Sequence, residues 1–145
     1  MIGAIVAMNS EAEILLGQTE VFRSLTVSGK EVYVGRAFGK DVTVVVCGVG
    51  KVNAALGAQL AVSKFDAEKL FNFGVAGGLN KRTALAGVYQ IEKAVQFDFD
   101  LSQFNGTKVG TLDEYKENYL KLNTFKAPFE KRKLGTADRF NDSLE

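Results

Sequence analysis

The sequence contains no histidine and a single cysteine, Cys47, and both scarcities limit the chemistry open to the chain. Histidine is the commonest metal ligand and the usual general base near neutral pH, so with one cysteine we expect no metal site. We also expect no cofactor. Any acid–base step must then fall to carboxylates. One cysteine cannot form an internal disulfide, and Cys47 ends the apolar run 42–47. This position predicts a buried, inert thiol in a reducing, cytoplasmic setting.

An excess of charge of either sign is also missing. Eighteen basic and seventeen acidic residues leave a formal net charge of +1, which provides no electrostatic footprint for nucleic acid or an anionic membrane. No apolar stretch approaches the roughly 20 residues of a membrane helix, and no basic region precedes the first apolar run. The 145 residues, 46% of them hydrophobic, predict one globular domain over 1–145 whose partners are small molecules or proteins.

The stretch 69–79 is the most informative part of what is present. It is an apolar run that ends in Gly74, Gly77 and Gly78, which predicts a buried strand followed by a tight turn. Open α/β sheets bind ligands at such strand ends, where glycines leave room against bare backbone. A tight turn without a ligand explains the glycines equally well.

Residues 2–8 form a second continuous apolar run, typical of a strand buried on both faces. Asn9 or Ser10 then predicts the cap of a helix that ends near Gly17. Glu11 therefore stands at a strand-to-helix junction, close to the carboxyl end of a central strand. Its carboxylate could serve chemistry there or simply complement the helix dipole.

Three further strands are expected at 24–27, 31–37 and 41–47, joined as two hairpins by glycine-containing turns. The segment 48–52 contains two glycines and a lysine, but Val52 replaces the magnesium-binding Ser or Thr of a phosphate-binding loop. Asn53 replaces the third glycine of the dinucleotide pattern. What remains is a glycine turn that leads into a small-residue helix over 52–65.

The second half predicts a strand at 87–95, a helix within 112–125 and a last strand at 131–136. Between them, 97–104 alternates aromatic and acidic residues, which suggests a loop whose aromatics cover the core or a neighbouring subunit. Together these elements predict an α/β fold with a central mixed, twisted sheet flanked by helices. A strand and a polar turn normally lead into another element, so we expect the fold to be incomplete at its C-terminus.

Five segments together resemble the purine nucleoside phosphorylase and nucleosidase superfamily, most closely the methylthioadenosine/S-adenosylhomocysteine nucleosidases. The segments are 5–11, 48–57, 73–79, 98–104 and 136–140. The resemblance implies hydrolysis of the N-glycosidic bond of a 5′-substituted adenosine, methylthioadenosine or S-adenosylhomocysteine, in methionine salvage. Phosphate-using relatives usually present a glycine and basic residues near the first strand end, where this chain offers a carboxylate, so hydrolysis is favoured over phosphorolysis.

By the same resemblance, Glu11 activates the water, and Leu101 and Phe104 enter the pocket of a neighbouring subunit in a homodimer. The implied substrate-binding residues are Ala7, Met8, Val49, Val75, Ala76, Gly77, Phe140 and Asn141. Phe140 would stack on the purine and Asn141 would present its backbone to the edge of the base.

The departures from the family pattern leave alternatives open. Val75 stands where these nucleosidases commonly carry serine, Ala137 where glycine is common and Phe97 where histidine is often found. The acidic residue that protonates the departing purine has no counterpart, because none of the acids near the end of the chain lies in the right motif. We therefore expect a homodimer or a complementary C-terminal fragment. Phosphate-dependent phosphorolysis and a non-catalytic nucleoside-binding or assembly module remain the alternatives.

Overall fold

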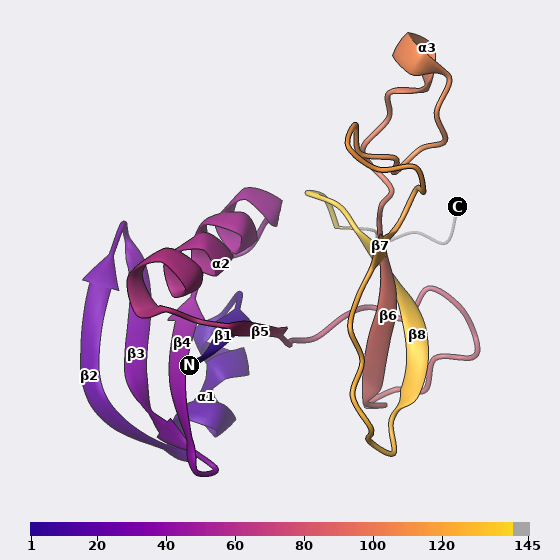
Figure 1. Cartoon of the computed structure of the whole chain (residues 1–145). Coiled ribbons are helices and arrows are strands. Elements are labelled where there is room, and N and C mark those ends of the chain that lie inside the picture. The colour runs from indigo at the N-terminus through magenta and orange to yellow at the C-terminus, as the bar shows by residue number, and fades with distance from the viewer. Residues whose placement is uncertain (141–145) are drawn as a thin grey trace. The chain divides into compact units, whose positions relative to one another are not determined.

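The computed structural model describes residues 1–140, and the chain divides into two compact units, Met1–Ala76 and Gly77–Glu145 (Figure 1). The single domain expected over 1–145 stays a prediction. No helix in the described part of the chain is long and apolar enough to cross a membrane.

The first unit is built on a five-stranded mixed sheet in the order β2-β3-β4-β1-β5 (Figure 1). The strands are β1 (Ile2–Val6), β2 (Thr19–Val27), β3 (Lys30–Ala37), β4 (Lys40–Val46) and β5 (Lys69–Asn72). β1 runs parallel to both β4 and β5, whereas β2, β3 and β4 form an antiparallel meander. The predicted mixed sheet and its two hairpins are confirmed.

Both hairpin turns require backbone conformations that favour glycine. Ser28 and Gly29 have φ of 50° and 73°, and Phe38 and Gly39 have φ of 50° and 72°. Positive φ at both central residues is the geometry of type I′ turns, whose twist matches that of the flanking strands. The first hairpin is longer than expected, because β2 begins at Thr19 and pairs with β3 along its whole length.

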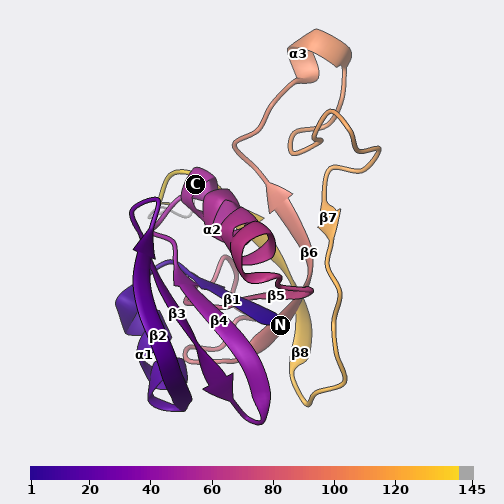
Figure 2. The same ribbon diagram turned by 60° about the vertical axis from the view of Figure 1, so that its left-hand side comes forward.

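Two helices pack against opposite faces of this sheet: α1 (Asn9–Gly17) and α2 (Lys51–Phe65). Figure 2 shows α2 crossing one face and α1 behind the strands. Alternate residues of β1 and β4 point to the two faces, as a strand's period of two requires. The core beneath α1 contains Ala4, Val6, Ala12 and Val44. The core beneath α2 contains Ile5, Val32, Val45, Cys47, Ala61, Phe65 and Ala67.

The strand over Lys69–Asn72 forms, but the prediction that it is buried is wrong. All four of its residues are exposed. β5 lies at the edge of the sheet, where β1 is its only strand partner among the described residues. An edge strand lacks the second neighbour that would cover it, so its apolar side chains Leu70 and Phe71 remain 45% and 43% exposed.

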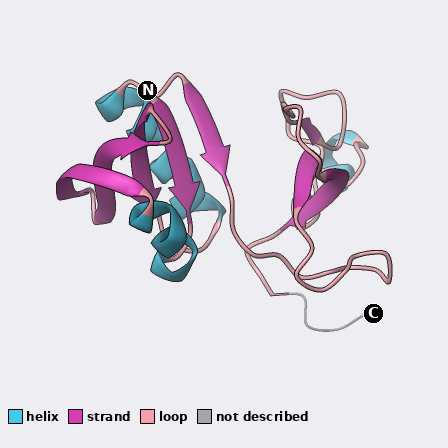
Figure 3. Cartoon of the chain, turned by 90° about the horizontal axis from the view of Figure 1, so that it is seen from below, coloured by secondary structure: helices cyan, strands magenta, loops and turns pink. Residues whose placement is uncertain are grey.

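The second unit is a smaller sheet in the order β7-β6-β8, with long connections (Figure 3). β6 (Tyr89–Gln96) runs parallel to β8 (Glu130–Thr136) and antiparallel to β7 (Leu120–Lys121). A short helix, α3 (Ser102–Asn105), lies within the aromatic and acidic loop. The strands expected at 87–95 and 131–136 are confirmed to within two residues.

The helix expected within 112–125 is absent, and turns and β7 occupy this range. Leu120 and Lys121 pair with β6 instead, and the Asn118 side chain donates a hydrogen bond to the Val109 carbonyl. Pairing with a neighbouring strand therefore overrides the local helix propensity of this lysine- and glutamate-rich segment.

Candidate functional site

The carboxyl end of β1 positions Glu11. The chain leaves β1 at Val6 and enters α1 at Asn9, which places Glu11 in the first turn of the helix. The predicted cap by Asn9 or Ser10 is wrong, because Met8 occupies the cap position and makes no side-chain cap bond. Glu11 compensates by accepting the Met8 N–H, as the third residue of a capping box does.

Three backbone N–H groups hold the Glu11 carboxylate. Oε2 accepts hydrogen bonds from the amides of Ala7 and Met8, each at 3.2 Å. Oε1 accepts one from the amide of Val75 at 2.9 Å. Glu11 therefore joins the ends of two neighbouring parallel strands, β1 and β5. A helix-dipole role alone would not explain the contact with Val75, which lies 64 residues away in sequence.

Gly74 makes room for this carboxylate. A Cβ atom built at position 74 would lie 2.5 Å from Glu11 Oε1, and its three nearest atoms all belong to the Glu11 carboxyl group. Real Cβ contacts are not this short. The glycine is required by the close approach of a side chain from α1, and the two readings that the sequence left open, a ligand site and a turn without a ligand, both stay predictions.

The glycine segment after β4 reaches the same strand end. Gly48 donates a hydrogen bond to the Ala7 carbonyl at 3.1 Å, and Cys47 donates one to the Val6 carbonyl at 2.8 Å. The Ala7 residue thus bonds Glu11 through its N–H and Gly48 through its carbonyl. The segments 5–11, 48–50 and 73–75 meet around the carboxyl end of β1, as the parallel strands predict.

Cys47 lies at this edge but faces the core. It is 2% exposed, and its thiol contacts the carbonyl oxygens of Val6 and Gly48 at 3.2 and 3.3 Å. Burial raises the pKa of the Cys47 thiol, and the backbone hydrogen bond and the charge of Lys30 only partly oppose this effect. The predicted burial of the thiol is confirmed. Its inertness stays a prediction, which the raised pKa supports because a protonated thiol is a poor nucleophile.

The other predicted site residues of the first unit present exposed surface. Met8, Val49 and Val75 are 38%, 59% and 82% exposed, and Ala76 is also exposed. Ala7 is half-buried beneath them. The structure therefore brings Glu11, Ala7, Met8 and Val75 together by direct hydrogen bonds, while their roles toward a substrate stay predictions.

The remaining predicted residues belong to the second unit. Gly77 and Phe140 are exposed, Leu101 is half-buried at the start of α3, and Phe104 is 90% exposed. Asn141 lies outside the described residues.

Two hydrogen bonds tie the last described loop to the end of β6. Asp138 N–H donates to Asp98 Oδ2 at 2.9 Å, and Phe97 N–H donates to the Thr136 carbonyl at 3.2 Å. The Arg139 guanidinium lies 5.8 Å from the centre of the Phe97 ring. The segments 98–104 and 136–140, which the resemblance assigns to the subunit contact and the purine side, thus touch within this unit through Asp98 and Asp138.

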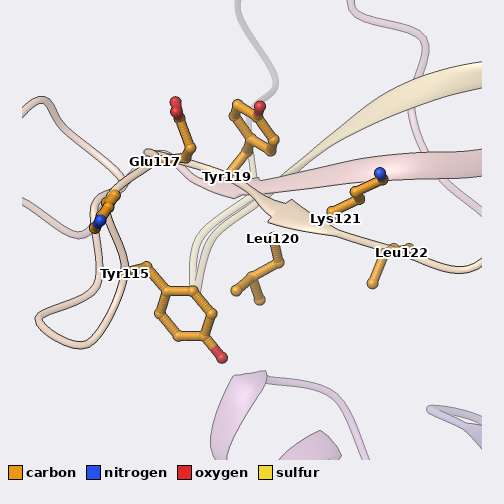
Figure 4. Close-up of a pocket in the computed structure, with 7 residues that line it drawn as sticks. Tyr115, Glu117, Tyr119, Leu120, Lys121 and Leu122 are labelled. Atoms are coloured by element: carbon orange, nitrogen blue, oxygen red, sulfur yellow. The ribbon is translucent and has the colours of Figure 1, made fainter.

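A hollow of about 530 Å³ in the second unit is lined by one continuous stretch around β7. Figure 4 shows Tyr115, Leu120 and Leu122 on one side of this stretch and Tyr119 on the other. None of the predicted site residues lines it, and a single stretch of chain provides no converging polar groups, so we assign no ligand to it. The described residues contain no cluster of histidine, cysteine or carboxylate side chains that could hold a metal ion.

We compared the chain with known protein families. A family model described as the phosphorylase superfamily matches residues 1–134. The chain belongs to the phosphorylase superfamily. The predicted resemblance and the α/β fold class are confirmed by this match and by solved structures of similar fold.

Several relatives within the phosphorylase superfamily are 5′-methylthioadenosine/S-adenosylhomocysteine nucleosidases. Those of Listeria monocytogenes (serotype 4a) and Marinomonas are 36% identical over 106 and 104 residues, 73% and 72% of this chain. The matched parts are 46% and 45% of the relatives, so the chain spans about half the length of the curated relatives it matches.

Solved structures agree. The nucleosidase of Neisseria meningitidis in complex with methylthio-immucillin-A is 26% identical, with a TM-score of 0.85 over 96% of this chain and 65% of that chain. The Streptococcus pyogenes S-adenosylhomocysteine nucleosidase with 5-methylthiotubericidin is 27% identical, with a TM-score of 0.84 over 96% of this chain and 63% of that chain. Futalosine hydrolase of Helicobacter pylori shares the fold, with a TM-score of 0.85 at 23% identity over 96% and 64% of the two chains.

Sequence reasoning missed two residues at this edge of the superfamily fold, Lys30 and Asn53. Lys30 Nζ donates to Asn53 Oδ1 at 2.6 Å, and Asn53 Nδ2 donates to the Val49 carbonyl at 2.7 Å. The sequence pattern places Lys30 only in the turn between the expected strands 24–27 and 31–37. The hairpin topology could have revealed Lys30, because β3 begins where its antiparallel neighbour β4 ends, beside the glycine loop.

Proposed function

We propose that the protein is a purine nucleosidase, an N-ribosyl hydrolase that cleaves the N-glycosidic bond of a 5′-substituted adenosine such as methylthioadenosine or S-adenosylhomocysteine. The observation that carries this proposal is the Glu11 carboxylate held by the amides of Ala7, Met8 and Val75 at the carboxyl end of β1. The relatives named as nucleosidases provide the substrate class.

The geometry suits Glu11 to the activation of water. An ionised carboxylate has about four acceptor positions on its two oxygens. Two N–H groups occupy Oε2 and one occupies Oε1, which leaves an acceptor position on Oε1 for a water O–H. The N–H contacts fix the direction of that position, so the water would be held in one place and its proton taken by Oε1.

The reaction then needs a second proton. As the bond between the anomeric carbon and the purine nitrogen breaks, charge builds on the sugar as in other glycoside cleavages. The water oxygen bonds to the anomeric carbon and gives its proton to Glu11, while the departing purine takes up a proton. We assign no residue of this chain to that second transfer, so the proposal concerns the complete protein, and a further segment or chain would supply the acid.

The assembly and setting are proposed on the same basis. The 90% exposure of Phe104 supports its predicted insertion into a neighbouring subunit's pocket. The place of β5 at the end of the strand order supports pairing with a complementary fragment or a second copy. We further propose a role in methionine salvage, which follows from methylthioadenosine as substrate, and a cytoplasmic setting, for which the single, buried Cys47 is the support.

The test is adenine release from methylthioadenosine by the unmodified protein, Glu11→Gln and Glu13→Gln. Glu13 is an exposed acid on the same helix and serves as the matched control. Loss of a positioned general base lowers the rate by about 10²–10⁴-fold, so Glu11→Gln should fall by that factor and Glu13→Gln should not change. Calorimetry with methylthioadenosine should show binding by all three.

Three outcomes would contradict the proposal. Undiminished turnover by Glu11→Gln would remove Glu11 from the reaction. Activity that depends on added phosphate would indicate phosphorolysis. Uptake of methylthioadenosine by the unmodified, complete protein without release of adenine would indicate a nucleoside-binding module.

A further inference from the structure

The loop between β4 and α2 contains the exposed residue Val49 between two glycines, Gly48 and Gly50. Gly48 has φ of 90° and Gly50 has φ of 107°, and Val49 between them is 59% exposed. Glycine loses more backbone freedom on folding than any other residue. A loop of this kind holds one conformation only if other groups fix it.

Hydrogen bonds fix both ends of this loop. At the start, Gly48 donates to the Ala7 carbonyl at 3.1 Å, which ties the loop to the residue that also bonds Glu11. At the end, the Asn53 side chain donates to the Val49 carbonyl at 2.7 Å. The orientation of the Val49–Gly50 peptide therefore depends on the Asn53 amide.

Lys30 fixes the amide in turn. Its ammonium donates to Asn53 Oδ1 at 2.6 Å. Since an ammonium group only donates, this contact determines which side of the amide carries the oxygen and turns Nδ2 toward Val49. A Cβ at Gly48 would lie 3.3 Å from Asn53 Nδ2 and 3.6 Å from Lys30 Nζ, so both side chains pack against the loop that they hold.

The sheet topology places Lys30 at this edge. Glu31 pairs with Val46, the last residue of β4, so Lys30 lies one residue beyond the carboxyl end of that strand. The type I′ turn at Ser28 and Gly29 brings the chain back into β3 at this point. The ammonium thus comes from a separate hairpin, close enough for its charge to act on the Cys47 thiol.

We propose that Lys30 and Asn53 are positioning residues, and that they hold the Val49 loop in the conformation that receives the nucleoside beside Glu11. This inference rests on the proposed function and extends it to two residues that do not themselves contact the reacting atoms. The class of ligand is the same, a 5′-substituted adenosine, and the loop would contribute to its binding rather than to the bond cleavage.

The experiment compares Asn53→Ala, Lys30→Met, the double variant and the conservative Lys30→Arg. Gln59→Ala is the matched control, because it removes an exposed amide from the same helix. Three quantities are measured on the complete protein. These are the rate of amide hydrogen exchange over residues 48–52 in the free protein, and the KM and the kcat for methylthioadenosine. Thermal melting identifies any variant that has lost its fold.

The expected result is faster exchange over 48–52 and a KM raised about tenfold, the loss of roughly one hydrogen bond, with a much smaller change in kcat. Lys30→Met and Asn53→Ala should not add in the double variant, because Lys30 acts through Asn53. Lys30→Arg should keep the exchange rate over 48–52 and the KM close to those of the unmodified protein. Gln59→Ala should change neither the exchange rate nor the KM.

Unchanged exchange in Asn53→Ala, an unchanged KM in a folded variant, or strict additivity would overturn the positioning role while leaving the nucleosidase proposal intact. Failure of the unmodified protein to bind or cleave methylthioadenosine would overturn the proposed function and this inference together. The two failures are therefore distinguishable.

Discussion

At the scale of single residues, the contact between Gly74 and Glu11 makes a prediction that does not depend on activity. The three atoms nearest to a Cβ at position 74 would all belong to the Glu11 carboxyl group, and the shortest of these distances would be 2.5 Å. We expect Gly74→Ala to lower the free energy of unfolding by about 1–3 kcal/mol, the usual cost of overpacking. In a Glu11→Ala background the same change should lower it by much less, because the obstructing group is gone. Urea unfolding of the four proteins of this cycle measures the difference.

Gly17→Ala is the control for this cycle. Gly17 is exposed at the end of α1, and a Cβ there would meet nothing within 4 Å. Its effect should be small and the same in both backgrounds, as for independent sites. Equal losses for Gly74→Ala with and without Glu11 would show that some other contact requires the glycine.

The same pair shows how far a sequence defines a site. Glu11 and Gly74 were both found from the sequence, because one follows a buried strand and the other ends an apolar run. Their contact was not, since it joins residues far apart in the chain. Met8 at the helix cap was missed for a related reason, because Glu11 satisfies the cap from three residues further along the chain.

At the scale of elements, the turn between β3 and β4 is a point of conformational strain. Phe38 has φ of 50° and its side chain is 79% exposed, so nothing in the turn requires an aromatic residue. Asparagine followed by glycine is the favoured pair for a type I′ turn. We expect Phe38→Asn to raise the free energy of unfolding by about 0.5–1 kcal/mol, because asparagine tolerates positive φ better. The midpoint of urea unfolding measures it.

Two controls separate turn geometry from the mere loss of an exposed aromatic. Phe22→Asn removes a 59% exposed phenylalanine from β2, where asparagine disfavours the strand, so stability should fall or stay unchanged. Gly39→Ala places a side chain at φ of 72° and should destabilise the turn. If Phe38→Asn and Phe22→Asn both stabilised the protein, turn geometry would not be the cause of the gain.

The elements that the sequence predicts well are those defined by local patterns. The two hairpins are marked by glycine-containing turns between strand-like segments. The helix α2 is marked by an uninterrupted segment that is rich in small residues. The range 112–125 fails because its composition favours a helix while β6 offers Leu120 and Lys121 a strand partner. β5 was placed correctly along the chain but assigned the wrong burial, since an apolar run does not reveal how many neighbours its strand will have.

At the scale of the whole molecule, the net charge of +1 and the β5 edge of the five-stranded sheet act together. A chain so close to neutrality has little electrostatic repulsion between copies. β5 is the last strand of this sheet among the described residues, and its apolar side chains Leu70 and Phe71 are exposed. The chain spans about half the length of the curated relatives it matches.

We therefore expect this 145-residue chain to self-associate, with a weight-average mass in sedimentation equilibrium that rises with concentration. Phe71→Lys places a charge on the β5 edge, where lysine discourages strand addition, and should shift the chain toward monomer. Ile14→Lys introduces the same charge at an 82% exposed position on α1 and should leave association unchanged. Equal loss of association in both variants would point to net charge rather than the edge. A monodisperse, cooperatively melting monomer from the unmodified chain would show that the β5 edge is stable without a partner.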